Sequence, residues 1–217
     1  MKDAASGKAV RGADGARGLV LRPGDGQSFR FDPGALCLEL LLTGGPGELA
    51  KWESLHTPAD LVAWAELSRL PAGLEPVVTP GELADARRLR DALLRITRAR
   101  VSGRELPVAD LAVVNEAAAR PSPVPRLTPS GGRDWVSGVD GSQLLSAVAR
   151  DAVELFGGPY AERVRECGAD DCGLLFVDTS RPGRRRWCSM ERCGNRHKVR
   201  AHRARPEEPQ SQESRAS

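Results

Sequence analysis

Residues 167–198 read CGADDCGLLFVDTSRPGRRRWCSMERCGNRHK, and they contain four of the five cysteines of the chain. Four residues separate Cys167 from Cys172, fifteen residues follow, and the same spacing of four separates Cys188 from Cys193. Two such pairs are typical of a zinc site with four thiolate ligands, because each pair can turn two sulfur atoms toward one ion. The sequence therefore predicts one structural Zn²⁺ bound by these four cysteines.

Other uses of the cysteines fit the sequence less well. Two structural disulfides are the alternative, but the first thirty residues lack the apolar stretch of a signal peptide. We therefore expect a cytoplasmic protein, in which thiols stay reduced. A redox pair has two residues between its cysteines, and a catalytic zinc keeps one ligand position for water. The fifth cysteine, Cys37, lies in an apolar run and is expected to be a small buried side chain.

The residues around the cysteines predict the layout of a small zinc-stapled domain. Tyr160–Glu166 is expected to form a connecting helix, Leu174–Thr179 a strand, and Arg185–Cys188 a strand that returns from a turn. Ser189 can cap a helix that carries the last cysteine and runs to about Arg205. This order of knuckle, hairpin and helix is treble-clef-like. Few large apolar residues accompany it, so the metal is expected to hold the fold together.

The rest of the chain predicts an α+β protein whose N-terminal domain is mainly helical, with a small β-sheet. The expected elements are a strand at Ala35–Thr43, helices that begin at Pro58 and Pro80, helices over Val108–Arg120 and residues 145–155, and a hairpin of residues 126–128 and 135–139. The expected divisions are a disordered leader over 1–27, this domain over 28–160, the zinc finger over 161–205 and a disordered tail over 206–217.

The positive charge of the chain is concentrated near its C-terminal end. The 217 residues have a formal net charge of +3, whereas residues 161–205 hold twelve Lys and Arg against six Asp and Glu. A basic module attached to a near-neutral domain favours a polyanionic partner. Arginines recur every three or four residues after Ser189 and share one helix face. The side chains expected to contact nucleic acid are Arg184, Arg185, Arg186, Arg192, Asn195, Arg196, Lys198, Arg200 and Arg203.

Several of these side chains also have a purely structural interpretation. Asn195 can pair with an adenine edge, or it can hydrogen-bond to backbone carbonyls beside the zinc. The arginine face can be a solvated surface. Trp187 is expected to belong to the core of the finger, and His197 to its surface. Asp170 and Asp171 are expected to lie in a solvated turn.

The stretch WCSMERCGNRHK at 187–198 closely resembles the signature of the CGNR zinc finger, and the upstream cysteine pair and LFVDTS at 175–180 fit as well. The preceding part resembles the ABATE domain that accompanies this finger, in TPADLVAW at 57–64 and LRDAL at 89–93. It departs from that family at ELLLT, 39–43, where Asp-Phe-x-Asn-Thr is frequent. The resemblance implies zinc binding, and it implies a bacterial regulator of stress-induced transcription that binds DNA.

These observations favour a DNA-binding transcription regulator over an enzyme. The chain has no glycine-rich phosphate loop and no HExxH, and its three histidines form no recognisable catalytic pattern. It has no apolar run long enough to cross a membrane. The expected partners are nucleic acid, DNA in preference to RNA, and, for the N-terminal domain, a small-molecule ligand or a second copy. The alternatives are a protein-interaction module whose arginines bind an acidic partner, and an RNA-binding protein.

Overall fold

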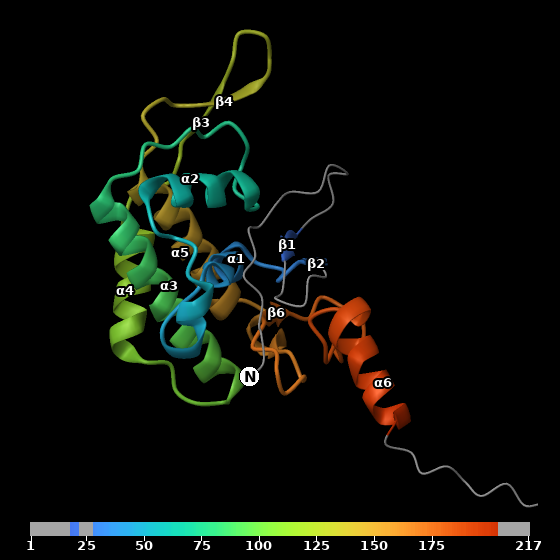
Figure 1. The fold of residues 1–217 in the computed structure, drawn as a ribbon. Coiled ribbons are helices and arrows are strands. Elements are labelled where there is room, and N and C mark those ends of the chain that lie inside the picture. Colours follow the sequence, from blue (N-terminus) through green and yellow to red (C-terminus); the bar gives the residue numbers. More distant parts are fainter. Residues whose placement is uncertain (1–17, 22–27, 204–217) are drawn as a thin grey trace, which may run out of the picture.

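The computed structural model describes residues 18–21 and 28–203, and side chains as far as residue 200 (Figure 1). The predicted tail and most of the predicted leader lie outside the described residues. In chain order the elements are β1 (Leu19–Leu21), β2 (Phe29–Phe31), α1 (Leu36–Leu40), 3-10 turns at Leu41–Thr43 and Gly47–Trp52, α2 (Pro58–Leu67), α3 (Pro80–Val101), α4 (Val108–Ala119), β3 (Pro125–Leu127), β4 (Arg133–Trp135), α5 (Gly141–Gly157), a 3-10 turn at Ala161–Arg163, β5 (Val164–Glu166), β6 (Leu175–Val177), a π-helix at Met190–Gly194 and α6 (Asn195–Arg203).

Helices α2 to α5 form the body of the molecule. Helices α3, α4 and α5 lie against one another, and α2 crosses one end of them (Figure 1). Helices α2, α3 and α5 each begin with a capping box. At α3, the Thr79 hydroxyl accepts from the Glu82 amide at 3.3 Å, and the Glu82 carboxylate accepts from the Thr79 amide at 2.8 Å, so amides without helical partners are satisfied. The four helices predicted for the N-terminal domain are confirmed. No helix in the described part of the chain is long and apolar enough to span a membrane.

The predicted strand at Ala35–Thr43 is wrong, because this run forms the short helix α1 followed by a 3-10 turn. All five residues of α1 are buried, and the helix lies against α3 and α5. A run that is buried on every side shows neither helical nor strand periodicity, so its pattern does not distinguish the two. The Asp151 carboxylate of α5 accepts the Cys37 amide at 2.8 Å, which satisfies a donor in the first turn of α1. Cys37 itself is fully buried, as predicted.

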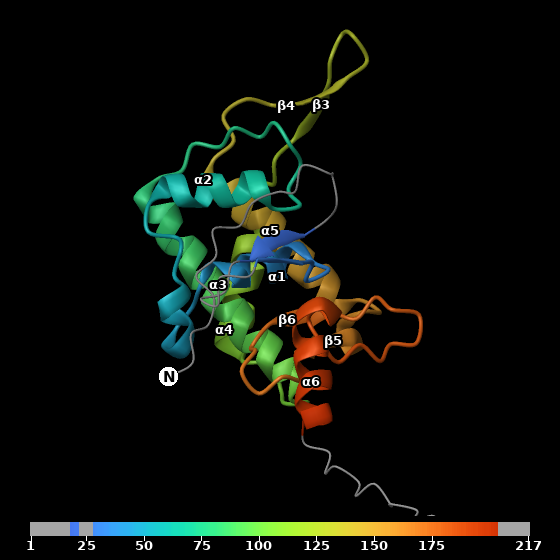
Figure 2. The ribbon, with the colours of Figure 1, turned by 45° about the vertical axis from the view of Figure 1, so that its right-hand side comes forward.

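Within the described residues, the strands form three separate antiparallel hairpins, β1–β2, β3–β4 and β5–β6. The predicted hairpin is present as β3–β4, in which Arg126 faces Asp134, but its second strand covers Arg133–Trp135 and not residues 135–139. It extends away from the helices (Figures 1 and 2). Residues Leu19–Leu21 were expected within a disordered leader, and this expectation is wrong for them, because they form β1 and pair with β2. The buried Leu19, Leu21 and Phe31 explain the order of this hairpin.

Two expectations for the cysteine-rich segment are also wrong. The connecting helix at Tyr160–Glu166 is a 3-10 turn followed by strand β5. The strand near Leu175 exists as β6, but it pairs with β5, and Arg185–Cys188 is not a strand. The reason is that the amides of the returning segment are used elsewhere. The Arg185 amide donates to the Asp178 carboxylate at 2.8 Å, and the Cys188 amide to the Cys167 sulfur at 3.3 Å.

The cysteine-rich segment shares a core with the helices. Val164, Leu175 and Val177 of β5 and β6 belong to the main apolar cluster, together with side chains of α1, α3 and α5. The Val177 amide donates to the Pro33 carbonyl at 2.8 Å. Gly34 has a φ of +88°, and a Cβ there would lie 3.1 Å from the Val177 Cβ, so this close approach requires glycine. The structure confirms the predicted α+β class, but it joins the two parts tightly.

Candidate metal centre

The four predicted cysteines converge on one point. Their sulfur atoms all lie within 4.8 Å of one another. The Cys188 sulfur is 3.7 Å from that of Cys172 and 3.5 Å from that of Cys193. A zinc ion with four sulfur ligands at about 2.3 Å requires sulfur atoms roughly 3.8 Å apart. The spacing therefore fits one tetrahedral zinc ion with its four positions filled by protein.

The electrostatics of the cluster also call for a cation. Hydrogen bonds from the neighbouring thiols stabilise the Cys167 thiolate, and the one from Cys172 has the largest effect. These bonds hold the pKa of Cys167 well below its usual value. The pKa of Cys188 is raised, because its thiol donates to Cys167 and because burial opposes a further charge. Four thiolates this close together cannot all be ionised without a positive ion between them. A structural Zn²⁺ supplies that charge, and the four cysteines form the site for one such ion.

Each ligand comes from a different local structure. Cys167 directly follows β5, and Cys172 ends the knuckle that leads toward β6. Cys188 precedes the π-helix, and Cys193 lies within it. The knuckle is held to the second pair by the Gly168 amide, which donates to the Arg186 carbonyl at 2.8 Å. These backbone bonds bring two segments about twenty residues apart in sequence to the same ion.

An apolar shell surrounds the sulfur atoms. Cys167, Cys188 and Cys193 are buried in a cluster with Leu21, Phe31 and Phe176, and Phe29, Leu42, Ala169, Leu174 and Trp187 pack against it. Cys172 is half-buried. Part of this shell comes from β1 and β2, about 140 residues before the first ligand. The cysteine spacing alone contained no signal for that contribution.

Asp178 is a structural residue of the centre that the sequence reasoning did not single out. It is fully buried at the end of β6 and accepts hydrogen bonds from the Ser180 amide and hydroxyl and from the Arg185 amide. Burial raises the pKa of Asp178, but these hydrogen bonds outweigh it and the pKa is lowered. The Asp-x-Ser pattern after a strand is a signal for such a turn. Asp178 thus closes the loop that returns the chain to Cys188.

Asp171 was expected in a solvated turn, but its side chain is mostly buried. Its carboxylate accepts from the guanidinium groups of Arg196, in a very close contact, and of Arg200, at 3.4 Å. The side chain is 19 % exposed, and its second oxygen is buried without a hydrogen-bond partner. Burial raises the pKa of Asp171, but the hydrogen bond from Arg196 and the two positive charges outweigh it and the pKa is lowered. Asp171 therefore ties α6 to the first knuckle.

Some of the predicted nucleic-acid contacts are engaged within the protein. Arg185 lies over the Phe176 ring at 4.3 Å from its centroid, and its guanidinium donates to the Trp187 and Cys188 carbonyls. Arg192 lies over the Phe29 ring at 4.9 Å. Arg196 pairs with Asp171, as described above. These three arginines are only partly exposed, and their contacts hold segments around the metal centre together.

Other predicted contacts lie on the surface. Arg184, Arg186, Lys198 and Arg200 are exposed, and Arg186 lies over the Trp187 ring at 5.2 Å. Asn195 donates to the Glu191 carbonyl at 3.3 Å, which matches its structural interpretation. The side chain of Arg203 lies outside the described part of the chain. The exposed basic groups come from the loop before Cys188 and from α6, so they flank the metal centre.

The aromatic pair at the centre is only partly enclosed. The rings of Trp187 and His197 are 4.7 Å apart and tilted by 41°. Trp187 is half-buried and packs against the cysteine cluster, in agreement with a role in the core, and His197 is exposed, as predicted. His197 therefore lies outside the ligand set and covers one side of the tryptophan.

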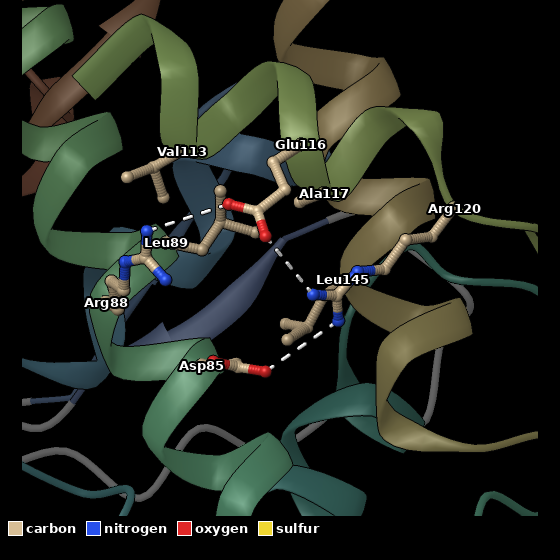
Figure 3. A pocket seen from close by; sticks show the side chains of 8 residues that line it. All are labelled: Asp85, Arg88, Leu89, Val113, Glu116, Ala117, Arg120 and Leu145. Carbon is tan, nitrogen blue, oxygen red and sulfur yellow. Dashed lines mark ion pairs between the residues drawn. The ribbon is translucent and has the colours of Figure 1, made fainter. Parts of the chain in front are cut away.

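The helical domain has a shallow pocket between α3, α4 and α5 (Figure 3). Glu116 pairs with Arg88 at 3.6 Å and with Arg120 at 3.7 Å, and Arg120 also pairs with Asp85 at 3.7 Å. The cavity volume of about 30 Å³ has room for one or two water molecules. This pocket is too small for the ligand expected from the sequence, since small-molecule sites are about tenfold larger.

The segment 39–43, which departs from the pattern frequent in the ABATE domain, carries a buried polar side chain. Glu39 is buried, and its carboxylate accepts from the Arg69 amide at 2.8 Å and from the Arg69 guanidinium at 2.9 Å. Arg69 also reaches the Asp32 carboxylate at 2.6 Å. Burial raises the pKa of Glu39, although Arg69 opposes this effect. This network ties the segment after β2 to the end of α2.

Comparison with known protein families gives two matches. Residues 34–159 match the ABATE family, described as "putative stress-induced transcription regulator". Residues 163–206 match the CGNR zinc finger. No curated protein matches the chain. The second match contains all four cysteines of the metal centre, and both matches begin after β2.

Proposed function

Because the chain belongs to the ABATE family and carries a CGNR zinc finger, we propose that it is a transcription regulator whose finger binds DNA. The zinc ion shapes the finger and takes part in no reaction. The N-terminal helical domain senses a ligand or mediates association with a second copy. The observation that carries this proposal is the group of exposed basic side chains beside a closed four-thiolate site.

The exposed cations come from two segments of the finger. Arg184 and Arg186 lie on the loop before Cys188, while Lys198 and Arg200 lie on α6. Helix α6 extends from the body in both views (Figures 1 and 2), so a duplex can approach it. We assign these four residues to phosphate contacts, because phosphates bind exposed Lys and Arg with release of counterions. Arg185, Arg192, Arg196 and Asn195 contribute by holding the finger in shape, and Arg203 follows on the same helix.

The salt dependence of binding tests the proposal. Full-length, zinc-loaded protein is titrated with a fluorescent duplex of random sequence from low to moderate salt. A reader with these four phosphate contacts gives a log–log slope of about −3.6, at roughly 0.9 per contact. The double variant R184A/R186A loses two contacts, so its slope becomes shallower by about 1.8. No binding of the wild type at low salt would overturn the proposal.

A matched variant separates local contacts from net charge. Arg104 is exposed in the loop after α3, and Arg133 lies over Trp135 at 5.2 Å, as Arg186 lies over Trp187. The variant R104A/R133A therefore removes the same charge from similar settings outside the finger. We expect it to keep the wild-type slope. Equal effects of the two double variants would show that the finger is not the binding surface.

A protein partner is the second candidate. The contacts with Asp171 show that the guanidinium groups of Arg196 and Arg200 bind a carboxylate at this surface. An acidic segment of another protein offers the same chemistry. In the titration above, binding to a polyglutamate peptide without binding to duplex DNA favours this candidate. Tighter binding to an RNA duplex than to a DNA duplex of the same sequence favours an RNA-binding role.

A further inference from the structure

The β1–β2 hairpin precedes both family matches, which begin at residues 34 and 163. Its side chains nevertheless belong to the shell of the metal centre. Leu21 and Phe31 are buried in the same cluster as Cys167, Cys188 and Cys193, and Phe29 packs against that cluster. The hairpin lies beside the start of the finger in both views (Figures 1 and 2). An element outside the recognised finger thus covers its ligands.

A second contact joins the hairpin to the helical half of the finger. The Arg192 guanidinium lies over the Phe29 ring at 4.9 Å from the centroid. Arg192 immediately precedes Cys193 within the π-helix. A cation over an aromatic face is attracted by the negative charge of the ring face, and more strongly where water is excluded. This contact places β2 against the segment that carries the fourth ligand.

We propose that the β1–β2 hairpin belongs functionally to the metal centre. The hairpin shields the sulfur atoms from water and thereby slows the loss of zinc. The apolar shell around a metal site controls the access of solvent and the local dielectric, and groups outside the ligand set change metal affinity by about 10–100-fold. Zinc leaves a thiolate site when protons or competing ligands reach the sulfur atoms. Leu21 and Phe31 are buried in the same cluster as three of these sulfur atoms. The inference concerns zinc retention and does not depend on DNA binding.

Leu61 supplies the control. Leu21 and Leu61 are both buried leucines, but Leu61 lies in α2 and belongs to the main apolar cluster, not to the cluster that contains the cysteines. Zinc-loaded full-length protein is mixed with excess pyridylazoresorcinol, a coloured chelator, and zinc transfer is followed by absorbance. We expect L21A to release zinc about tenfold faster than the wild type, and L61A to stay within about twofold of it. Equal release rates for L21A and the wild type would overturn the proposal.

A measurement on the unmodified protein covers the case in which L21A fails to fold. Coupling free energies between two sites are reciprocal. If the folded hairpin raises the affinity for zinc, then bound zinc stabilises the hairpin, and removal of zinc must loosen it. We expect the amides of residues 19–21 and 29–31 to exchange hydrogen at least tenfold faster after chelation. The β3–β4 hairpin has strands of the same length and is the internal reference, with unchanged exchange. Unchanged exchange in β1–β2 would show that the hairpin and the metal are independent, whatever the finger binds.

Discussion

At the scale of single residues, Arg90 shows how a charge is accommodated inside the helical body. The side chain is almost fully buried in the middle of α3, and its guanidinium donates to Glu53 at 2.8 and 2.9 Å and to Asp91 at 3.0 Å. Glu53 lies just after the 3-10 turn at Gly47–Trp52 and also accepts the Leu55 amide. A buried cation needs such partners, because removal of one leaves an uncompensated charge.

The variant Glu53→Gln tests this pair. We expect it to lower the free energy of unfolding by roughly 2–3 kcal/mol at neutral pH, measured by urea denaturation. Burial raises the pKa of Glu53, but hydrogen bonds from Arg90 and Leu55 outweigh it and the folded-state pKa is lowered. A lowered pKa stabilises the fold above the ordinary value of about 4.3, and this stabilisation is lost as the pH falls through the folded value.

The difference between wild type and Glu53→Gln must therefore narrow below about pH 4. Glu48→Gln is the matched control, because Glu48 pairs with Lys51 at 3.4 Å while its side chain is 95 % exposed. Exposed pairs contribute little, so almost no change is expected there. A loss in Glu53→Gln that is the same at every pH would contradict the electrostatic explanation.

At the scale of elements, α6 depends on the knuckle for its placement. Its first turn holds Arg196, whose contact with Asp171 joins it to the loop between Cys167 and Cys172. Asn195 adds a bond to the Glu191 carbonyl in the π-helix. The remaining described side chains of α6 are exposed. A nine-residue helix is marginal alone, so these contacts decide whether it is formed.

The variant Asp171→Asn tests the anchoring of α6. It keeps the shape of the side chain and removes its charge, so we expect zinc to be retained. The amides of residues 196–200 should exchange hydrogen about tenfold faster, since a hydrogen bond between charged groups contributes on the order of 1.5 kcal/mol. Asp170→Asn, at the exposed neighbour, should leave exchange unchanged. Faster exchange in both variants would point to the knuckle backbone instead of the Asp171 carboxylate.

At the scale of the whole molecule, the zinc finger and the helical domain form one connected structure. Strands β5 and β6 place Val164, Leu175 and Val177 in the main core, and β1–β2 covers the cysteines from the other end of the chain. Loss of the metal therefore reaches beyond the finger. Each buried aliphatic side chain that is exposed costs about 1.5–3 kcal/mol.

Zinc removal tests this connection. We expect chelation to leave most of the helical circular dichroism intact and to lower the thermal midpoint of the helical domain by at least about 5 °C. Cys188→Ser should show the same lowered midpoint without chelator, and chelator should then have no further effect. A helical domain that melts at the same temperature with and without zinc would mean that the two parts fold independently.

Features that depend only on neighbours along the chain could be predicted before the fold was known. The spacing of Cys167, Cys172, Cys188 and Cys193 indicated the metal site, because two short loops suffice to present each pair. The Thr-Pro and Thr-x-x-Glu signals indicated where helices begin, because a cap is satisfied within one turn. The charge density indicated a basic segment, but it did not distinguish the exposed Arg184 from the engaged Arg185 beside it.

Features that depend on residues far apart in the chain became clear only from the folded structure. The apolar run at 36–40 is helical because other elements bury it on every side, which removes any periodic signal. Strand β6 pairs with β5 because Asp178 and the Cys167 sulfur take the amides of the returning segment. Leu21 and Phe31 reach the metal centre through packing across more than 130 residues, and no local pattern encodes a contact of that span.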